Sequence, residues 1–161
     1  MKKASKLLIS GLMMVSIYSC VKKKEKNYPD EPQIYYEGIN NDVVHFFDSA
    51  SSVGIRFRFT DGDGNLANIE GDSAIYIADY RSDTLYASYS YPMPVIPPEL
   101  RSGKALEGRV TVTLTQNYFL PRFDSLHVEA RKDTLVLKLY IEDEAGNKSN
   151  EIETGTIYIE E

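Results

Sequence analysis

Residues 55–65 read Ile-Arg-Phe-Arg-Phe-Thr-Asp-Gly-Asp-Gly-Asn, and they indicate the fold class of this 161-residue chain. Apolar and charged side chains alternate from Ile55 to Phe59, which is the period of a strand with one buried face. The run then ends in Asp-Gly and Gly-Asn pairs, whose residues tolerate the positive φ of tight turns. The stretch therefore predicts a half-buried β-strand followed by a turn.

The same two-residue period recurs along the chain. It predicts further strands at 43–47, 75–77, 84–91, 109–115, 135–141 and 157–159. Arg81-Ser82-Asp83 suits a short hairpin connection, and Gly155 suits a bulge before the last strand. Residues 122–131 fit either a helical turn or an edge strand.

These strands predict an all-β fold, a two-sheet immunoglobulin-like β-sandwich of about seven strands over residues 34–161. The chain shows no sustained helical period after residue 30, and a parallel sheet would need helical crossovers. A barrel is the main alternative. Residues 92–104 contain four prolines, which exclude a central strand and predict a stiff excursion between the sheets.

The start of the chain predicts export. A basic opening precedes the apolar run Leu7–Ser19, which is followed by Cys20, the one cysteine of the chain. The run is shorter than the ~20 residues that a spanning helix needs, so the order predicts a signal peptide over residues 1–19 that is removed. A lone cysteine forms no internal disulfide. We therefore expect Cys20 to carry lipid; an ordinary secreted protein is the alternative.

Ile17-Tyr18-Ser19-Cys20 resembles the lipobox of bacterial lipoproteins. The resemblance implies that Cys20 is acylated and begins the mature chain, so the membrane itself is a partner. Residues 20–33 combine prolines with many charges and predict a disordered tether. Its four lysines suit anionic headgroups, whereas surface-exposed Bacteroidota lipoproteins usually resemble an acidic pattern here. We expect an outer-membrane lipoprotein on the periplasmic face rather than the cell surface.

Composition narrows the possible functions. Removing residues 1–19 takes away three lysines and moves the formal net charge from −6 to −9. An acidic surface argues against nucleic acid as a partner. His45 and His127 each stand alone, which disfavours zinc, and the sequence has no nucleophile or phosphate-loop motif. We expect a protein that is not an enzyme.

Two segments carry a further resemblance. Residues 57–66 are similar to the F-x-DGDGD-[IL]-G segment of small Bacteroidota lipoproteins of unknown function, with Asn65 in place of the third aspartate. Residues 140–150 resemble the D-x-AGN-x-S turn that joins the last two strands of many bacterial immunoglobulin-like domains. The resemblance implies that both segments are loops of one sandwich.

These two loops form the candidate metal site. Calcium prefers hard oxygen ligands, and D-x-D-x-N spacing supplies them at alternate positions. In an immunoglobulin-like topology both loops lie at one end. We expect no required cofactor and hypothesise a weak calcium site formed by Asp61, Asp63, Asn65, Glu142, Asp143 and Asn147. An EF-hand is disfavoured because Leu66 stands where its glycine belongs; ordinary turn chemistry is the alternative.

The sequence thus predicts a membrane-anchored, non-enzymatic binding or structural module of the cell envelope, with an envelope protein as a candidate partner. The alternative is a glycan-binding accessory module that uses a tyrosine-rich hairpin, with Tyr86 and Tyr89 as the stacking residues. Tyrosine is also a good strand former and the chain has no tryptophan, so a purely structural role for the hairpin is the other interpretation.

Overall fold

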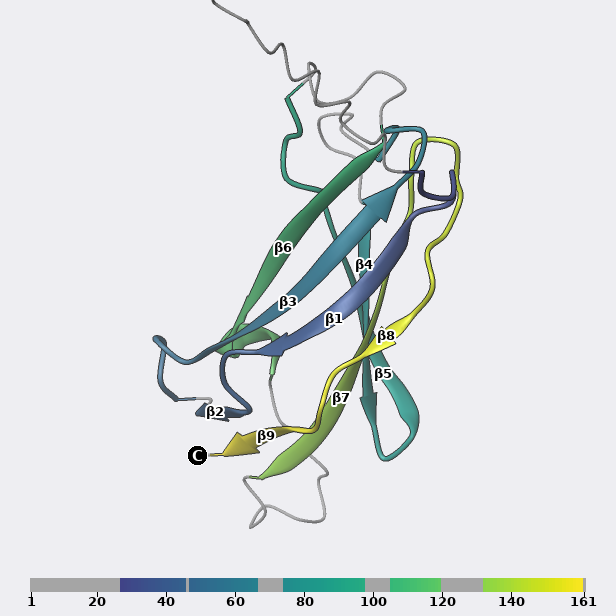
Figure 1. The fold of residues 1–161 in the computed structure, drawn as a ribbon. Helices are drawn as coiled ribbons and strands as arrows, with labels where there is room; N and C mark the ends of the chain where they lie inside the picture. The colour runs from purple at the N-terminus through teal and green to yellow at the C-terminus, as the bar shows by residue number, and fades with distance from the viewer. Residues whose placement is uncertain (1–26, 46, 67–73, 98–104, 120–131, 161) are drawn as a thin grey trace, which may run out of the picture.

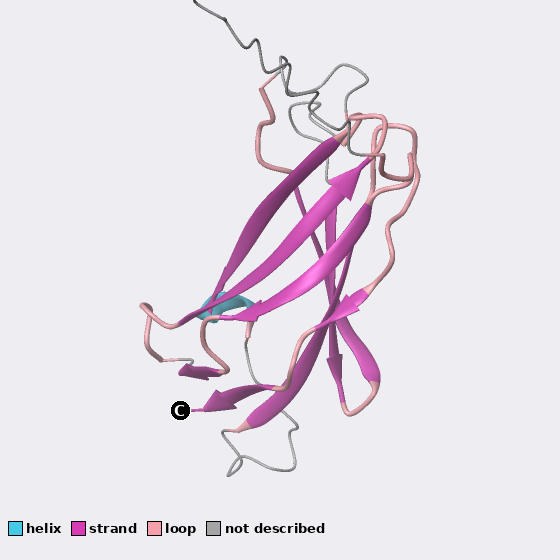
Figure 2. Cartoon of the chain, in the orientation of Figure 1, coloured by secondary structure: helices cyan, strands magenta, loops and turns pink. Residues whose placement is uncertain are grey.

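The computed structural model describes residues 27–45, 47–66, 74–97, 105–119 and 132–160 and shows two packed β-sheets (Figure 1). Its strands are β1 (Gln33–Ile39), β2 (Val43–His45), β3 (Ser52–Asp61), β4 (Ile75–Arg81), β5 (Thr84–Tyr91), β6 (Leu106–Thr115), β7 (Asp133–Ile141), β8 (Ile152–Glu153) and β9 (Ile157–Glu160). One 3₁₀ turn, η2 (Gln116–Tyr118), follows β6 (Figure 2). The predicted all-β sandwich is confirmed.

Several predictions fall on residues outside this description. The signal peptide, Cys20, His127 and the segment 122–131 are among them, so what was inferred for each stays a prediction. Within the described residues, no helix is long and apolar enough to span a bilayer.

The sheets have the strand order of an immunoglobulin-like sandwich. The smaller sheet has the order β1-β3-β6, and the larger has the order β2-β9-β7-β4-β5, with β8 also paired to β7. When β1, β3, β4, β6, β7 and β9 are taken as strands A, B, C, E, F and G, the sheets read A-B-E and G-F-C. The two sheets share no strand pair in the described residues, which argues against the barrel alternative.

The structure has nine strands rather than about seven because the first and last strands are each divided. The first changes sheet: β1 pairs antiparallel with β3, and β2 pairs parallel with β9. β1 escaped prediction because Ile34 is its one buried residue, so no alternation marks it. It begins at Gln33, one residue before the predicted start of the domain. The last strand is interrupted between β8 and β9, where Gly155 lies.

Two inward-facing rows of side chains set up the site. In β3 the buried row is Val53, Ile55, Phe57 and Phe59, and in β7 it is Leu135, Leu137, Leu139 and Ile141. These rows belong to opposite sheets and face each other across the core. The next position of the period is Asp61 in one row and Asp143 in the other. Both aspartates are buried, so the apolar core ends in acids.

The opposite end of the sandwich carries the predicted hairpin. Arg81 pairs with Thr84, and both intervening residues have positive φ, 50° at Ser82 and 59° at Asp83. This is the pattern of a two-residue type I′ turn. The hairpin turn lies at the far end from the loops that follow β3 and β7 (Figure 1). Residues 93–97 line one hollow together with residues 106–110 of β6, so the described part of the proline segment leaves β5 and reaches the smaller sheet, as the prolines predict.

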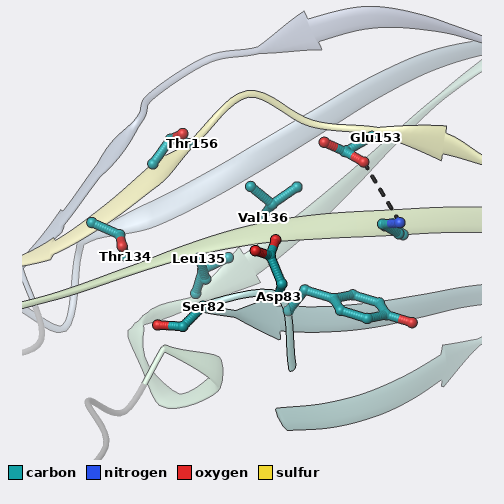
Figure 3. Close-up of a pocket in the computed structure, with 9 residues that line it drawn as sticks. Ser82, Asp83, Thr134, Leu135, Val136, Glu153 and Thr156 are labelled. Carbon is teal, nitrogen blue, oxygen red and sulfur yellow. Dashed lines mark ion pairs between the residues drawn. The ribbon is translucent and has the colours of Figure 1, made fainter. Parts of the chain in front are cut away.

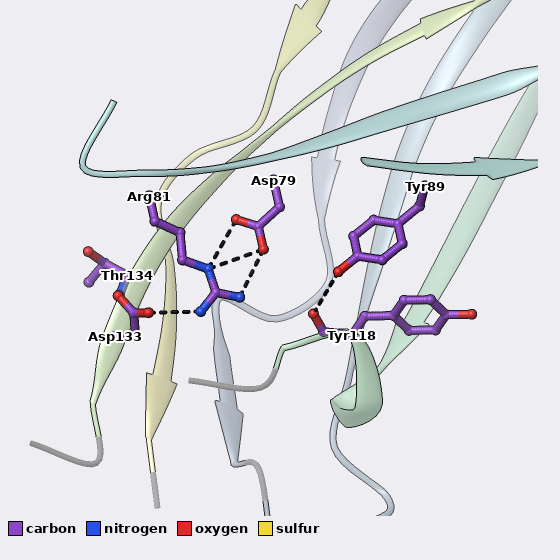
Figure 4. A network of polar contacts seen from close by, with 6 residues as sticks. All are labelled: Asp79, Arg81, Tyr89, Tyr118, Asp133 and Thr134. Atoms are coloured by element: carbon purple, nitrogen blue, oxygen red, sulfur yellow. Dashed lines mark hydrogen bonds and ion pairs between the residues drawn. The ribbon is translucent and has the colours of Figure 1, made fainter. Parts of the chain in front are cut away.

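A buried ion pair network stabilises that hairpin (Figure 4). The Arg81 side chain is fully buried and contacts Asp79 at 2.9 Å and Asp133 at 2.8 Å. Burial lowers the pKa of the Arg81 guanidinium, whereas hydrogen bonds and charges from Asp79 and Asp133 raise it. The net effect is a raised pKa for Arg81. A buried charge needs such partners, so this network is structural.

Candidate metal centre

The two acidic loops lie together at one end of the sandwich. Residues 62–66 follow β3, which ends at Asp61, and residues 142–150 follow β7 (Figure 1). A backbone hydrogen bond joins them, with the Glu144 N–H donating to the Asn65 carbonyl at 3.2 Å. Loops after these two strands share an end in immunoglobulin-like domains, so the fold itself brings the loops into contact.

Three carboxylates meet where the loops touch. Each of Asp61, Asp63 and Asp143 offers one oxygen, and these oxygens all lie within 4.8 Å of one another. Asn65 belongs to the same group because its side-chain amide donates to Asp63 at 2.8 Å. We call these four residues, Asp61, Asp63, Asn65 and Asp143, the acidic pole.

Asp61 is the most constrained member of the acidic pole. It has no solvent exposure, because it occupies the inward position that follows Phe59. One carboxylate oxygen, Oδ2, accepts a hydrogen bond from the Leu66 N–H at 2.8 Å. The other, Oδ1, is buried and has no hydrogen-bond partner among the described residues. The Oδ1 atom of Asn65 is buried and unpartnered in the same way.

Asp63 and Asp143 each accept hydrogen bonds from within their own turns. Asp63 accepts from the Asn65 N–H at 3.4 Å, and Asp143 accepts from the Asn147 N–H at 2.8 Å and its side-chain amide at 2.9 Å. Gly64 and Gly146 supply the positive φ, 73° and 84°, that the two turns require. A carboxylate has about four acceptor positions, so both aspartates keep acceptor capacity for a further ligand.

The electrostatics of the acidic pole are unfavourable without a cation. Burial raises the pKa of Asp61 from its ordinary 3.8 to about 7, against the lowering effect of the Leu66 N–H. The charge of Asp63, the hydrogen bond that a protonated Asp61 carboxyl shares with Asp63 and the charge of Asp143 contribute further to the rise. Among the described residues, no lysine or arginine forms an ion pair with any of the three carboxylates. Above pH 7, where Asp61 is ionised, three like charges are therefore held together without a compensating cation from the described residues.

The acidic pole contains four of the six residues proposed from the sequence. Glu142 lies outside it: its carboxylate is 4.0 Å from the Lys148 ammonium, and it occupies the outward position after Ile141. Asn147 is adjacent, but its side-chain amide donates to Asp143. Asn147 therefore orients a candidate ligand, and its own role as a ligand stays a prediction.

The oxygens of the acidic pole suit a hard cation. Three carboxylates and one amide oxygen would supply four or more of the six to eight oxygens that calcium takes. None of the four residues offers the nitrogen or sulfur that zinc sites use. The buried unpartnered oxygens of Asp61 and Asn65 are the acceptors that a cation would satisfy.

Sequence reasoning missed the segment that packs on Gly62, between Asp61 and Asp63. A methyl group on Gly62 would lie 2.7 Å from the Pro29 carbonyl carbon and would also overlap the Tyr28 carbonyl oxygen. The sequence predicts that residues 28 and 29 belong to a disordered tether, whereas in the structure they contact the loop after β3. The glycine was the one available signal, because it permits this close approach.

The tyrosines proposed for glycan stacking face inward or contact a cation. The Tyr89 ring meets the Tyr118 ring edge to face at 5.3 Å, and its hydroxyl donates to the Tyr118 carbonyl (Figure 4). The Tyr86 ring lies 4.0 Å from the Arg81 guanidinium carbon. Glycan binding by Tyr86 and Tyr89 stays a prediction, and these contacts do not favour it.

A shallow hollow lies away from the acidic pole, between the β4–β5 turn, β7 and the β8–β9 connection (Figure 3). Its volume is about 310 Å³. Glu153 and Lys138 form an ion pair of 3.7 Å at its edge, and the Lys138 ammonium also lies 4.9 Å from the Tyr80 ring centre. Lys138 and Glu153 compensate each other's charge here, whereas no lysine or arginine among the described residues pairs with the carboxylates of the acidic pole.

Comparison of the chain with protein-family models and with curated proteins finds no match.

Proposed function

We propose that the protein is a lipid-anchored, non-enzymatic module of the bacterial cell envelope whose immunoglobulin-like sandwich binds calcium at the acidic pole. One observation carries the calcium part. The fully buried Asp61 carboxylate has one oxygen without a hydrogen-bond partner among the described residues, and it lies in a group with two more carboxylates. A buried acceptor left without a donor costs about 1–3 kcal/mol, and more when it is charged. A bound cation removes that cost.

Calcium is favoured over other cations by the ligand types. Carboxylate and amide oxygens suit calcium and magnesium, whereas zinc sites use cysteine and histidine. Magnesium demands near-ideal octahedral geometry and keeps several waters. Two of the acidic-pole carboxylates are already fixed by their turns, which suits the irregular coordination that calcium accepts.

The anchor part of the proposal comes from the sequence. The basic start, the short apolar run and the solitary Cys20 are explained together by acylation of that cysteine. Stable membrane attachment takes more than one acyl chain or an added basic patch, and Lys22 to Lys26 supply the basic charge. We place the protein at the outer membrane, on the periplasmic face.

Calorimetric titration of the mature chain, carrying Cys20→Ser for solubility, tests the calcium site. We expect one calcium ion to bind with a dissociation constant of about 10⁻⁴ to 10⁻³ M, the range of extracellular calcium modules. Asp63→Asn should abolish the heat. Glu142→Gln is the matched control, because it removes the same charge from the same end without touching the acidic pole. Absence of heat and of any thermal shift at 10 mM calcium would end the proposal.

The anchor has its own test. Cells that express the protein are labelled with palmitate, and the label should appear on the wild-type chain and not on Cys20→Ala. A mature protein that carries no lipid but retains an intact Cys20 thiol would show that the chain is an ordinary secreted protein.

A further inference from the structure

We infer that calcium at the acidic pole fixes the segment 28–34 to the sandwich and so sets how far the domain extends from its membrane anchor. This inference rests on the proposed function, because it gives a role to the same ion. Its basis is that the two loops that hold the acidic pole are also the two loops that hold the incoming chain.

The loop after β3 holds the start of the segment. Gly62 packs directly beneath the carbonyl groups of Tyr28 and Pro29, with no room for a side chain. The Tyr28 hydroxyl donates to the Glu107 carboxylate at 2.9 Å, and Glu107 is paired with Thr60 beside the same loop. Residues 28 and 29 are thus seated on the residue between Asp61 and Asp63.

The loop after β7 holds the other end of the segment. The Asn150 side chain forms two hydrogen bonds with the backbone of Ile34, donating to its carbonyl and accepting from its N–H, both at 2.9 Å. The Asn150 side chain thus pairs with the Ile34 backbone as a residue of a neighbouring strand would. Asn150 closes the loop that begins at Glu142 and contains Asp143.

The ion would control the spacing of these two loops. Asp61 and Asp63 lie on one loop and Asp143 on the other, so without a cation the loops repel each other at short range. Between the loops the structure shows one backbone hydrogen bond, from Glu144 to Asn65. A bound cation would convert that repulsion into a bridge. The segment 28–34 makes all of these contacts only when both loops are in place, because Gly62 lies on one loop and Asn150 on the other.

Thermodynamic linkage makes the effect reciprocal. If calcium favours the seated segment by some factor, the seated segment tightens calcium by the same factor, and such couplings are typically about 5- to 150-fold. Proline at 29 and 32 removes two backbone donors from the segment. Few alternative hydrogen bonds therefore compete with the contacts that seat it.

Release of the segment would lengthen the free chain between the membrane anchor and the sandwich. Whatever its conformation, the chain from Cys20 to Tyr28 spans at most about 29 Å, at no more than 3.6 Å per residue. If the segment leaves the sandwich, the free length runs from Cys20 to Ile34 and spans at most about 50 Å. Calcium would hold the acidic pole close to the bilayer, where the ion and the anionic headgroups meet.

Hydrogen exchange of the mature Cys20→Ser chain, with calcium and with chelator, tests the coupling. We expect exchange of the peptide covering residues 28–34 to slow at least 5-fold in calcium. The reference is the peptide covering β5, at the far end of the sandwich, which reports general stabilisation. Calcium must slow exchange at residues 28–34 by a larger factor than it slows exchange in β5.

Two variants separate this inference from the proposed function. Asp63→Asn should lose both the calorimetric heat and the protection. Asn150→Ala touches no ligand of the acidic pole, so it should still bind calcium, about 5-fold or more weakly, while losing the protection. If wild-type calorimetry shows no heat, the proposed function fails. If calcium binds but exchange at residues 28–34 slows no more than in β5, the coupling alone is overturned.

Discussion

Asp61→Asn should stabilise the calcium-free domain, although it removes the central ligand of the proposed site. The folded protein holds the Asp61 carboxylate in full burial beside two further acids. An amide of the same shape carries no charge, and its oxygen can still accept the Leu66 N–H that Asp61 accepts at 2.8 Å. Its NH₂ group would face the carboxylates as a donor. The substitution therefore removes a repulsion and satisfies an unpartnered position.

The size of the gain follows from the pKa of Asp61. That pKa is about 7 in the folded state against the ordinary 3.8, and 1.36 kcal/mol per pKa unit gives about 4 kcal/mol as the upper bound. Structural relaxation lowers this figure, so we expect a gain of about 2–4 kcal/mol at pH 8. For a domain of this size each kcal/mol raises the melting temperature by about 4 °C.

The raised pKa of Asp61 also predicts the direction in which the stability of the domain changes with pH. Between pH 4 and 7 the folded protein keeps the Asp61 proton while the unfolded chain has released it, so the folded state binds more protons. Stability of the wild-type domain in chelator should therefore fall as pH rises through this window, and become flat above it. The Asp61→Asn variant should lack this part of the slope.

Thermal unfolding in chelator at pH 4, 6 and 8 measures both effects, and repetition in 10 mM calcium shows that the variant has lost its response. Glu142→Gln serves as the control for a lost charge at the same end, and it should change stability by less than about 1 kcal/mol because exposed ion pairs contribute little. An Asp61→Asn domain that is less stable than wild type at pH 8, or that keeps the wild-type slope, would refute the reasoning.

Three further predictions concern the fold. Arg81→Met should destabilise the domain by about 3–5 kcal/mol in urea unfolding, because it leaves the buried Asp79 carboxylate uncompensated, and adding Asp79→Leu should restore much of the loss. Gly108→Ala should cost about 1–3 kcal/mol, since its methyl group would lie 2.7 Å from the buried Phe59 ring; an unchanged midpoint would show that the ring moves freely. Asp83→Gly should raise stability by about 0.5–1 kcal/mol in the same assay, because φ is 59° there, and a loss would contradict the turn assignment.

The strands that could be predicted are those whose two faces differ. In β3 and β7, buried side chains alternate with half-buried or exposed ones along most of the strand, and the alternation of apolar and polar residues makes both strands easy to recognise in the sequence. β1 lies at the edge of the smaller sheet with Ile34 as its one buried residue, and β8 has two residues. Neither carries a period that a sequence pattern can detect. The convergence of the two acidic loops could be predicted from the fold class, because strand order determines which connections lie at the same end of the sandwich.

The burial of Asp61 was not predictable from turn chemistry, although the period of the strand contained the information. Residues 55, 57 and 59 face the core, and residue 61 is the next in that row. The Asp-Gly pair suggested that the turn begins at Asp61, which would leave its side chain in water. In the structure the strand continues through Asp61. The segment at Tyr28 and Pro29 then packs on the adjacent Gly62, a contact between distant parts of the chain that no local pattern encodes.

Turn chemistry also fails as a complete explanation of the acidic pole. It accounts for Asp63 and Asp143, whose oxygens accept hydrogen bonds within their own turns. It does not account for Asp61, where serine or asparagine could accept the Leu66 N–H without bringing a third charge into the core. A carboxylate at this position lowers the stability of the empty domain and contributes no turn that a neutral residue could not. The cost becomes intelligible when the position serves a cation, and that is why stability in chelator, compared with stability in calcium, is the decisive measurement on Asp61→Asn.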